Sequence, residues 1–299
     1  MSWKLGRGIL AVTITAVLGG TIGCGTDEAT GPGGTSNPSR PARPEVPPAP
    51  GDHTLGLDQA GTERTWEVHA PPGYRPGTPT PLVVALHGTD QSVEALRENS
   101  GLDAIADREG FLVAYPKAKS RQFSRLPDEG DDVNFVRAVV DELVKKWSVD
   151  PTRVYATGFS SGAGMTYTLG VEAAEVFAAI APVSGPFSGG PAGNDPGYKP
   201  SRPVSLITFI GNDDRNAAGM YSGLTKWHRN LGCQVGEPVW VDRGKTVNRT
   251  VSECPDGSEV VDYTVNRMGH AWPSPTGYRA AVDATEVMWE FFAAHARRA

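Results

Sequence analysis

The chain has 299 residues, of which 21% are charged and 39% hydrophobic, and its 28 basic and 34 acidic side chains give a net charge of -6. This composition is typical of a globular protein with one large core, and the acidic balance excludes the basic surface that nucleic-acid binding requires. The three cysteines are an odd number without zinc-ligand spacing, so we expect no metal site built on thiolates.

The N-terminal segment has the pattern of an export signal. Basic residues precede an apolar run at 9–18, which is too short to span a bilayer comfortably. Segment 21–24 resembles a bacterial lipobox, although Thr21 stands where that motif usually has leucine. We expect residues 1–23 to be a lipoprotein signal peptide and Cys24 to carry the lipid. Ordinary cleavage nearby, leaving a free thiol in an oxidising compartment, is the alternative.

Residues 24–50 have the composition of an extended tether. Seven prolines and four glycines occur between positions 25 and 50, and large apolar side chains are nearly absent. Such a stretch cannot bury a core, so we expect it to link the lipid to a folded domain at 51–299. The mature protein would then be extracellular or periplasmic and would contact a membrane only through its anchor.

Cys233 and Cys254 remain once the first cysteine is assigned to the lipid, and they lie 21 positions apart in a turn-rich stretch. In an oxidising compartment we expect a disulfide that closes a surface loop, worth about 3 kcal/mol in the chain-entropy model. A reactive thiol pair is the less favoured alternative, because no motif surrounds either cysteine.

From residue 51 onward, short apolar runs alternate with helical patterns. The apolar runs predict strands at 82–86, 111–115, 153–158, 178–183, 204–210 and 260–265. Helical spacing of apolar residues occurs at about 95–106, at 133–147 and around 282–292. Asp131 or Asp132 is available as the N-cap of the second helix. The alternation predicts a single α/β domain with a mostly parallel sheet and crossover helices.

A serine lies at the turn between a predicted strand and a helical stretch. Gly158-Phe159-Ser160-Ser161-Gly162 has the pattern G-x-S-x-G, which projects the serine hydroxyl at the carboxyl edge of a sheet. Chance placement would give about 0.3 matches in such a chain, so the weight of the pattern comes from the strand before it and the helix after it. We expect Ser160 to be a nucleophile.

A serine hydroxyl needs a base, and an imidazole serves best when a carboxylate fixes its tautomer. Asp213 and Asp214 follow the strand predicted at 204–210, and His270 follows the one at 260–265. The order Ser, Asp, His is that of an α/β-hydrolase. The order alone leaves both aspartates open as the acid.

The developing oxyanion needs two N–H donors, one just after the nucleophile and one after an early strand. Leu86-His87-Gly88-Thr89 directly follows the first strong strand. We expect the backbone N–H groups of Ser161 and Thr89 to be these donors. Taken alone, His87-Gly88 would be a tight turn and His270 a surface histidine, but four elements in this order at four strand ends favour catalysis.

Six segments together resemble a family of secreted esterases that includes polyhydroxybutyrate depolymerases, feruloyl and acetylxylan esterases and lipoproteins of LpqC type. The segments are LVVALHG from 82, GFLVAYP from 110, DDVNFV from 131, DPTRVYATG from 150, FAAIAPVSG from 177 and GHAWP from 269. The resemblance covers about residues 55–295. It implies one α/β-hydrolase domain without a cofactor, hydrolysis of esters carried on polymers, and Ser160, His270 and Asp214, in preference to Asp213, as catalytic residues.

The chain departs from that family at two places. Gly162-Ala163-Gly164-Met165 stands where the family usually has adjacent glycines before a methionine, and residues 117–130 are short and polar where many members carry a tryptophan. We expect the latter segment to border the substrate cleft. Trp272 is expected to be either an aromatic wall for an acyl group or sugar, or a packing residue.

These features predict a monomeric serine carboxylesterase without metal or cofactor. The expected substrates are feruloyl or acetyl esters of plant polysaccharide, or poly(3-hydroxybutyrate), and the short segment before residue 131 favours soluble or oligomeric forms. A surface-anchored binding lipoprotein that kept the fold without turnover is the alternative. The complete set of Ser, Asp and His disfavours it.

Overall fold

The computed structural model describes residues 46–124, 131–188, 195 and 197–297. The predicted signal peptide, Cys24 and most of the tether lie outside the described residues. The chain divides into two units, 1–44 and 45–299, and all of the described residues belong to the second unit. In the described part of the chain, no helix combines the length and hydrophobicity needed to cross a membrane.

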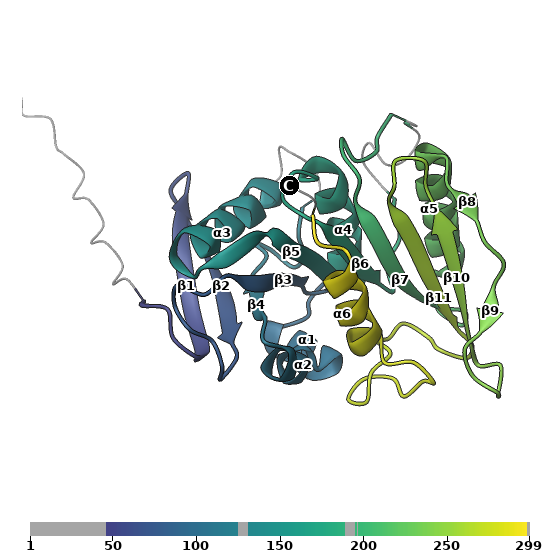
Figure 1. Cartoon of the computed structure of the whole chain (residues 1–299), viewed down its shortest axis with the longest axis horizontal. Coiled ribbons are helices and arrows are strands. Elements are labelled where there is room, and N and C mark those ends of the chain that lie inside the picture. Colours follow the sequence, from purple (N-terminus) through teal and green to yellow (C-terminus); the bar gives the residue numbers. More distant parts are fainter. Residues whose placement is uncertain (1–45, 125–130, 189–194, 196, 298–299) are drawn as a thin grey trace, which may run out of the picture. The chain divides into compact units, whose positions relative to one another are not determined.

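A mixed sheet runs through the middle of the domain (Figure 1). Its strands are β1 (Gly51–Gln59), β2 (Thr62–Ala70), β3 (Thr80–Leu86), β4 (Leu112–Pro116), β5 (Val149–Phe159), β6 (Ala179–Val183), β7 (Ser205–Gly211), β8 (Gln234–Val235), β9 (Val239–Trp240), β10 (Val247–Glu253) and β11 (Glu259–Val265). The order is β1-β2-β4-β3-β5-β6-β7-β11-β10-β8, and β9 pairs with β10. The middle strands β4 to β11 of this order are parallel, and β1, β2, β8, β9 and β10 add antiparallel edges.

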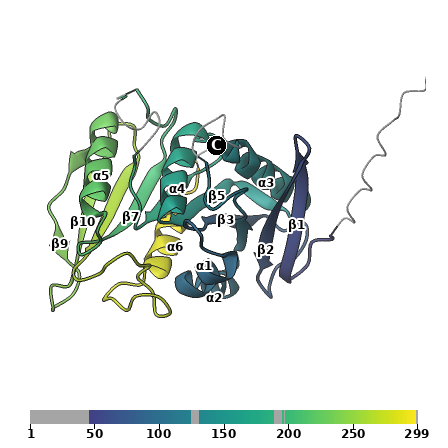
Figure 2. The same ribbon diagram turned by 180° about the vertical axis from the view of Figure 1, so that it is seen from behind.

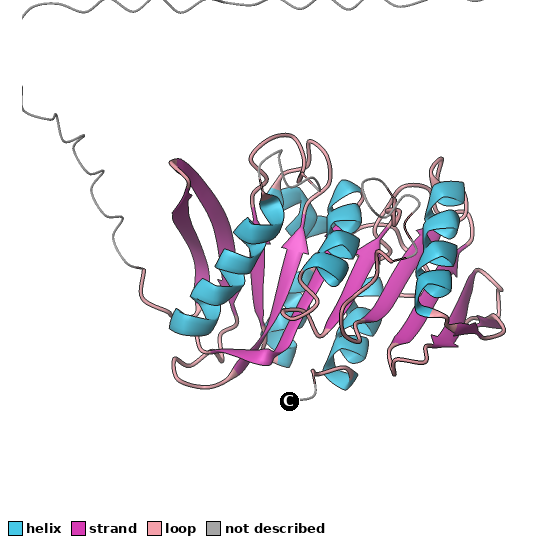
Figure 3. Cartoon of the chain, turned by 90° about the horizontal axis from the view of Figure 1, so that it is seen from above, coloured by secondary structure: helices cyan, strands magenta, loops and turns pink. Residues whose placement is uncertain are grey.

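Helices cover both faces of the sheet (Figure 2 and Figure 3). They are α1 (Val93–Ser100), α2 (Leu102–Glu109), α3 (Asp132–Lys146), α4 (Ser161–Glu172), α5 (Ala217–Leu231) and α6 (Ala284–Ala294). Helices α3, α4 and α5 contribute buried side chains to the apolar core on one face, and α1, α2 and α6 to the core on the other. Because the central strands are covered on both sides, they are buried along nearly their whole length, which explains their unbroken apolar sequences.

The six predicted strands and the single α/β domain are confirmed, with strand ends that shift by a few residues. The single helix predicted at about 95–106 is wrong, because the chain forms two helices there. Gly101 separates them with a left-handed φ of 65°, and its N–H caps α1 by donating to the carbonyl of Arg97. Only glycine adopts that conformation at little cost, so it ends the first helix. Asp131 is the N-cap of α3, and its side chain accepts the N–H of Asn134.

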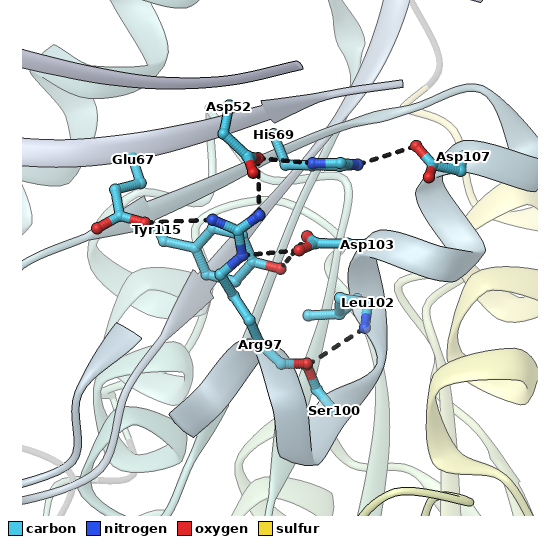
Figure 4. Close-up of polar contacts among 9 residues, drawn as sticks. All are labelled: Asp52, Glu67, His69, Arg97, Ser100, Leu102, Asp103, Asp107 and Tyr115. Atoms are coloured by element: carbon cyan, nitrogen blue, oxygen red, sulfur yellow. Dashed lines mark hydrogen bonds and ion pairs between the residues drawn. The ribbon is translucent and has the colours of Figure 1, made fainter. Parts of the chain in front are cut away.

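An arginine on α1 joins that helix to the antiparallel edge of the sheet (Figure 4). The guanidinium of Arg97 lies 2.7 Å from Asp52 on β1, 3.3 Å from Glu67 on β2 and 2.7 Å from Asp103 on α2. The hydroxyl of Tyr115 donates to the same Asp103 at 2.7 Å. These contacts fix α1 over the sheet by charge-assisted hydrogen bonds as well as by apolar packing.

His69 on β2 belongs to the same network, because it contacts Asp52 as Arg97 does (Figure 4). Its Nδ1 lies 2.8 Å from Asp52 and its Nε2 lies 2.9 Å from Asp107 on α2. Burial alone would lower the pKa of His69, but the hydrogen bonds and charges of the surrounding carboxylates outweigh it and raise that pKa. Carboxylates of two other elements therefore stabilise the charged form of the imidazole.

Candidate active site

Ser160 lies at a sharp turn between β5 and α4. Its backbone has φ 57° and ψ -115°, a region that residues other than glycine rarely occupy. The turn is held by the N–H of Ser160, which donates to Val183 at 3.0 Å, and by its carbonyl, which accepts from Gly164 at 3.2 Å. A strained residue held in place by its surroundings is typical of a functional site, and this turn has the geometry of a nucleophile elbow.

The second glycine of the G-x-S-x-G motif is required by close backbone packing. A Cβ built on Gly162 would lie 2.2 Å from the carbonyl oxygen of Leu86 at the end of β3. No side chain fits at that separation, so only glycine lets α4 begin this close to the neighbouring strand. The sequence motif thus sets where the serine stands relative to the loop after β3.

Asp214 and His270 form a hydrogen-bonded pair at the same edge of the sheet. Nδ1 of His270 lies 2.6 Å from Oδ2 of Asp214, whose side chain is fully buried, while 27% of the histidine side chain is exposed. The other carboxyl oxygen of Asp214 accepts the N–H of Asn216 at 2.8 Å. Asp213 is exposed instead, so of the two aspartates only Asp214 contacts the imidazole.

The histidine loop is attached to the residues that follow two neighbouring strands, β7 and β6. The N–H of Asp213 donates to the carbonyl of Met268 at 3.0 Å, and the hydroxyl of Ser184, just after β6, donates to the carbonyl of Ala271 at 2.7 Å. The ring of His270 lies 4.9 Å from the ring of Phe159, the residue before the serine. The loops after β7 and β11 therefore bring Asp214 and His270 together from positions 56 residues apart, and the contact with Phe159 places His270 beside the serine turn at the end of β5.

The loop after β3 passes directly beside the serine. A Cβ built on Gly88 would lie 3.3 Å from Cβ of Ser160, so the peptide leading to Thr89 adjoins the elbow. Ser161 is the first residue of α4, and an N–H at that position has no acceptor within its own helix. Both residues expected to supply N–H donors thus adjoin Ser160, since Ser161 directly follows it and Thr89 directly follows Gly88.

A cavity of about 350 Å³ opens beside His270, between α1 and the loop that follows β11. It is lined by apolar and polar side chains and backbone from Gln91, Leu96, Asn99, Phe159, His270, Ala271, Trp272, Thr276, Gly277 and Tyr278. Trp272 is 2% exposed, and its indole N–H donates to Thr285 at 3.0 Å. Its contacts are therefore mainly those of a packing residue, and it presents only a small surface to the cavity.

The lining residues from α1 and from the loop after Trp272 were not predicted. Leu96 and Asn99 lie in a helix whose sequence pattern indicates only core packing, and Tyr278 lies among turn-forming residues, so neither segment carries a signal for a binding site. The hydroxyl of Ser274 donates to the carbonyl of Asn99 at 2.5 Å and thereby joins the two walls. No local pattern carries that contact, because the two residues are 175 positions apart.

The polar segment after β4, expected to border the cleft, contacts the loop of Thr89. The N–H of Asp90 donates to the carbonyl of Arg121 at 2.8 Å, and the hydroxyl of Thr89 donates to Gln122 at 2.7 Å. The side chains of Asp90 and Arg121 also form an ion pair. The described part of this segment therefore supports the loop beside the serine, and residues 125–130 lie outside the described residues.

The predicted disulfide between Cys233 and Cys254 is present. It joins the end of α5 to the end of β10, and the chain it closes contains the short strands β8 and β9. Since β10 is antiparallel to β11, this end of β10 lies at the edge of the sheet opposite His270. Among the described residues, no group of three or more His, Cys, Asp or Glu side chains is placed to hold a metal ion.

Comparison with known proteins identifies the fold and the family of this chain. Residues 65–194 match the family model described as esterase PHB depolymerase. NocK of Nocardia uniformis subsp. tsuyamanensis, whose name assigns it provisionally to the esterases, is 33% identical over 264 residues, covering 75% of each chain. Feruloyl esterase C of Emericella nidulans is 31% identical over 255 residues, which cover 81% of this chain and 87% of that protein. Two further relatives are longer, and the chain spans 25% and 42% of their length.

The solved structure of an acetyl xylan esterase from Aspergillus awamori superposes with a TM-score of 0.61, covering 80% of this chain and 99% of that one at 17% identity. At that identity the superposition shows the fold alone, which is that of an α/β-hydrolase. NocK and feruloyl esterase C carry the family assignment, because the aligned region covers at least three quarters of both chains in each comparison. The chain belongs to the esterase family of the polyhydroxybutyrate depolymerases and is a carboxylic ester hydrolase.

Proposed function

We propose that the protein is a serine esterase in which Ser160 is the nucleophile, His270 the general base and Asp214 the acid that orients it. The hydrogen bond of 2.6 Å between His270 and the buried carboxylate of Asp214, at the strand edge where the strained serine turn also lies, carries the proposal. A carboxylate bound to Nδ1 keeps the proton on that nitrogen, so Nε2 has its lone pair available for the serine proton.

The reaction follows from these roles. The Ser160 oxygen attacks the ester carbonyl carbon while its proton passes to His270, and the carbonyl oxygen becomes an oxyanion. The carbon–oxygen bond to the alcohol then breaks, and His270 returns the proton to the leaving alcohol. Water attacks the acyl enzyme in the same way and releases the carboxylic acid. The N–H groups of Thr89 and Ser161 stabilise the oxyanion, and one such donor contributes about 10²–10³ in rate.

The proposed substrates are esters carried on polymers: feruloyl or acetyl esters of plant polysaccharide, or poly(3-hydroxybutyrate). The relative named a feruloyl esterase, the structural neighbour named an acetyl xylan esterase and the family description support these classes. The cavity beside His270 has a size within the usual range of ligand pockets, and we assign it to the acyl or alcohol part of the ester.

Export to an oxidising compartment is part of the proposal, and the disulfide supports it because such bonds persist outside the cytosol. Attachment through a lipid on Cys24 is also proposed, from the sequence of residues 21–24. A Cys24→Ala variant should lose the lipid mass and partition into the soluble fraction. A variant that remains in the membrane fraction would contradict the anchor.

Covalent labelling tests the mechanism. A fluorophosphonate probe should modify Ser160 in the folded protein, and Ser160→Ala should abolish both labelling and ester hydrolysis. Folded protein that takes up no label would favour the alternative of a binding lipoprotein. Rates on methyl ferulate, acetylated xylan, short nitrophenyl esters and polyhydroxybutyrate particles, measured side by side, then rank the proposed substrates.

A further inference from the structure

The buried imidazole of His87 has one defined tautomer. His87 lies directly after β3, and the residue is 7% exposed. The backbone N–H of Ala118 donates to its Nε2 at 3.2 Å, so that nitrogen carries no proton. The proton is then on Nδ1, which donates to the carbonyl oxygen of Gly88 at 2.8 Å. The ring is neutral and uses both of its nitrogens in contacts with the backbone.

The Gly88 residue is held at both of its backbone groups. Its carbonyl accepts a second hydrogen bond, from the N–H of Gln91 at 3.2 Å, and its own N–H donates to the side-chain oxygen of Gln91 at 2.8 Å. The peptide between Gly88 and Thr89 is trans, and in a trans peptide the C=O and the N–H point in opposite directions. Two donors that hold the Gly88 carbonyl therefore also set the direction of the Thr89 N–H.

We propose that His87 is a positioning residue, which aims the Thr89 N–H at the oxyanion by donating its Nδ1 proton to the carbonyl of the same peptide group. The inference rests on the proposed function, because it takes the Thr89 N–H as an oxyanion donor. It assigns a task to a histidine that does not itself contact the substrate. Preorganised donors contribute most when their direction is fixed before the reaction, and a buried hydrogen bond supplies that.

The surroundings of His87 keep its ring in place and uncharged. The ring of Phe123 packs 4.9 Å from it, and the charged groups that act on it are Asp132 of α3 and Lys117 after β4. Burial lowers the pKa of His87, and Lys117 lowers it further, against the opposing effects of the bond to Gly88 and of Asp132. A protonated ring would turn Nε2 into a second donor facing the Ala118 N–H, so the neutral form fits this site.

Three substitutions of His87 separate its two hydrogen bonds. In His87→Asn the amide nitrogen stands near the position of Nδ1 and can still donate to Gly88. His87→Leu has nearly the same shape as the asparagine variant but no donor. His87→Gln places its amide one carbon further out, where it can accept from Ala118 but cannot donate to Gly88. All three are compared with the native protein for thermal unfolding, for kcat and KM on a soluble nitrophenyl ester, and for inhibition by a trifluoromethyl ketone.

The ketone adds to the catalytic serine and places an oxyanion between the two N–H donors, Thr89 and Ser161. Its Ki therefore reports directly on how well these donors bind the oxyanion. We expect kcat of the leucine and glutamine variants to fall about 10- to 100-fold, with KM changed less than about threefold and Ki raised by the same factor as kcat falls. The asparagine variant should keep kcat within about fivefold of native. If the leucine variant does not fold, the comparison of asparagine with glutamine decides.

Two results would overturn the inference. One is a folded leucine or glutamine variant with native kcat and Ki. The other is an asparagine variant that folds but is as slow as the glutamine variant, because then the donor to Gly88 does not matter. Failure of the proposed function looks different: the native protein would hydrolyse no ester, or Ser160→Ala would remain active, whatever residue stands at position 87.

Discussion

Replacing Asp214 by asparagine should nearly abolish esterase activity while leaving the fold intact. The amide oxygen of Asp214→Asn can keep the hydrogen bond from the N–H of Asn216, now 2.8 Å to the carboxylate. The amide NH₂ then faces Nδ1 of His270 at the present 2.6 Å contact and donates to it. The imidazole proton moves to Nε2, which can no longer accept the proton of Ser160.

The size of the effect follows from the loss of the base. A histidine in the wrong tautomer costs about 10³–10⁴ in kcat, which corresponds to about 4–5.5 kcal/mol of transition-state stabilisation. Because the carboxylate is fully buried, solvent cannot replace it as the partner of the imidazole. The assay is the initial rate on a nitrophenyl ester, with the rate of fluorophosphonate labelling as a second measure that does not depend on substrate binding.

Asp213→Asn is the matched control, since the same atoms change one position away on an exposed side chain. Its kcat/KM should stay within about threefold of native. The assignment is refuted if Asp213→Asn loses more activity than Asp214→Asn, or if Asp214→Asn retains a tenth of the native rate while its labelling by the probe is unchanged.

Three other outcomes are expected. Gly162→Ala should prevent correct folding or lower the unfolding free energy by more than about 3 kcal/mol, because the new Cβ would lie 2.2 Å from a carbonyl oxygen. A variant that is folded by circular dichroism and fully active on a nitrophenyl ester would contradict this prediction. Replacing both Cys233 and Cys254 by serine should lower the unfolding free energy by about 3 kcal/mol in urea titrations. It should leave kcat unchanged at urea concentrations below the unfolding transition, since the disulfide lies at the edge of the sheet opposite His270. A large loss of kcat in the folded variant would show that the disulfide affects the active site. His69→Gln should destabilise the protein below pH 6.5 and have little effect at high pH. A histidine whose pKa is raised in the folded state contributes stability at low pH, and that contribution is lost as the pH rises through the raised pKa. Equal losses of unfolding free energy at pH 5.5 and pH 9.5 would show that the charge of His69 does not contribute to stability.

The strands that the apolar runs predicted are those of the parallel core, and the edge strands were missed. Strand β2 did carry an alternating signal, since Trp66, Val68 and Ala70 are buried on one face. The signal was obscured because a charged residue, Arg64, takes another buried position in the same series. Arg64 is accommodated there by an ion pair with Asp132 and by stacking over the ring of Phe135, at 3.9 Å. A buried charge of this kind is stable only with partners that the tertiary fold supplies.

The sequence by itself determined the features that depend on neighbouring residues. Strands buried on both faces must be apolar throughout, and the serine turn needs glycine where α4 meets β3, so the parallel core and the position of Ser160 could be inferred from local patterns. The break between α1 and α2 at Gly101 is of the same local kind, although it was not predicted.

Only the tertiary structure decided which groups meet at the edge of the sheet. Asp213 and Asp214 are adjacent in sequence and chemically identical, and the turn after β7 buries one against His270 while it exposes the other. The cavity joins α1 to a loop about 175 residues later through Ser274 and Asn99, and the tautomer of His87 depends on the N–H of Ala118 from the segment after β4. These contacts arise from the order of strands in the sheet, which brings distant loops together and leaves no local pattern in the chain.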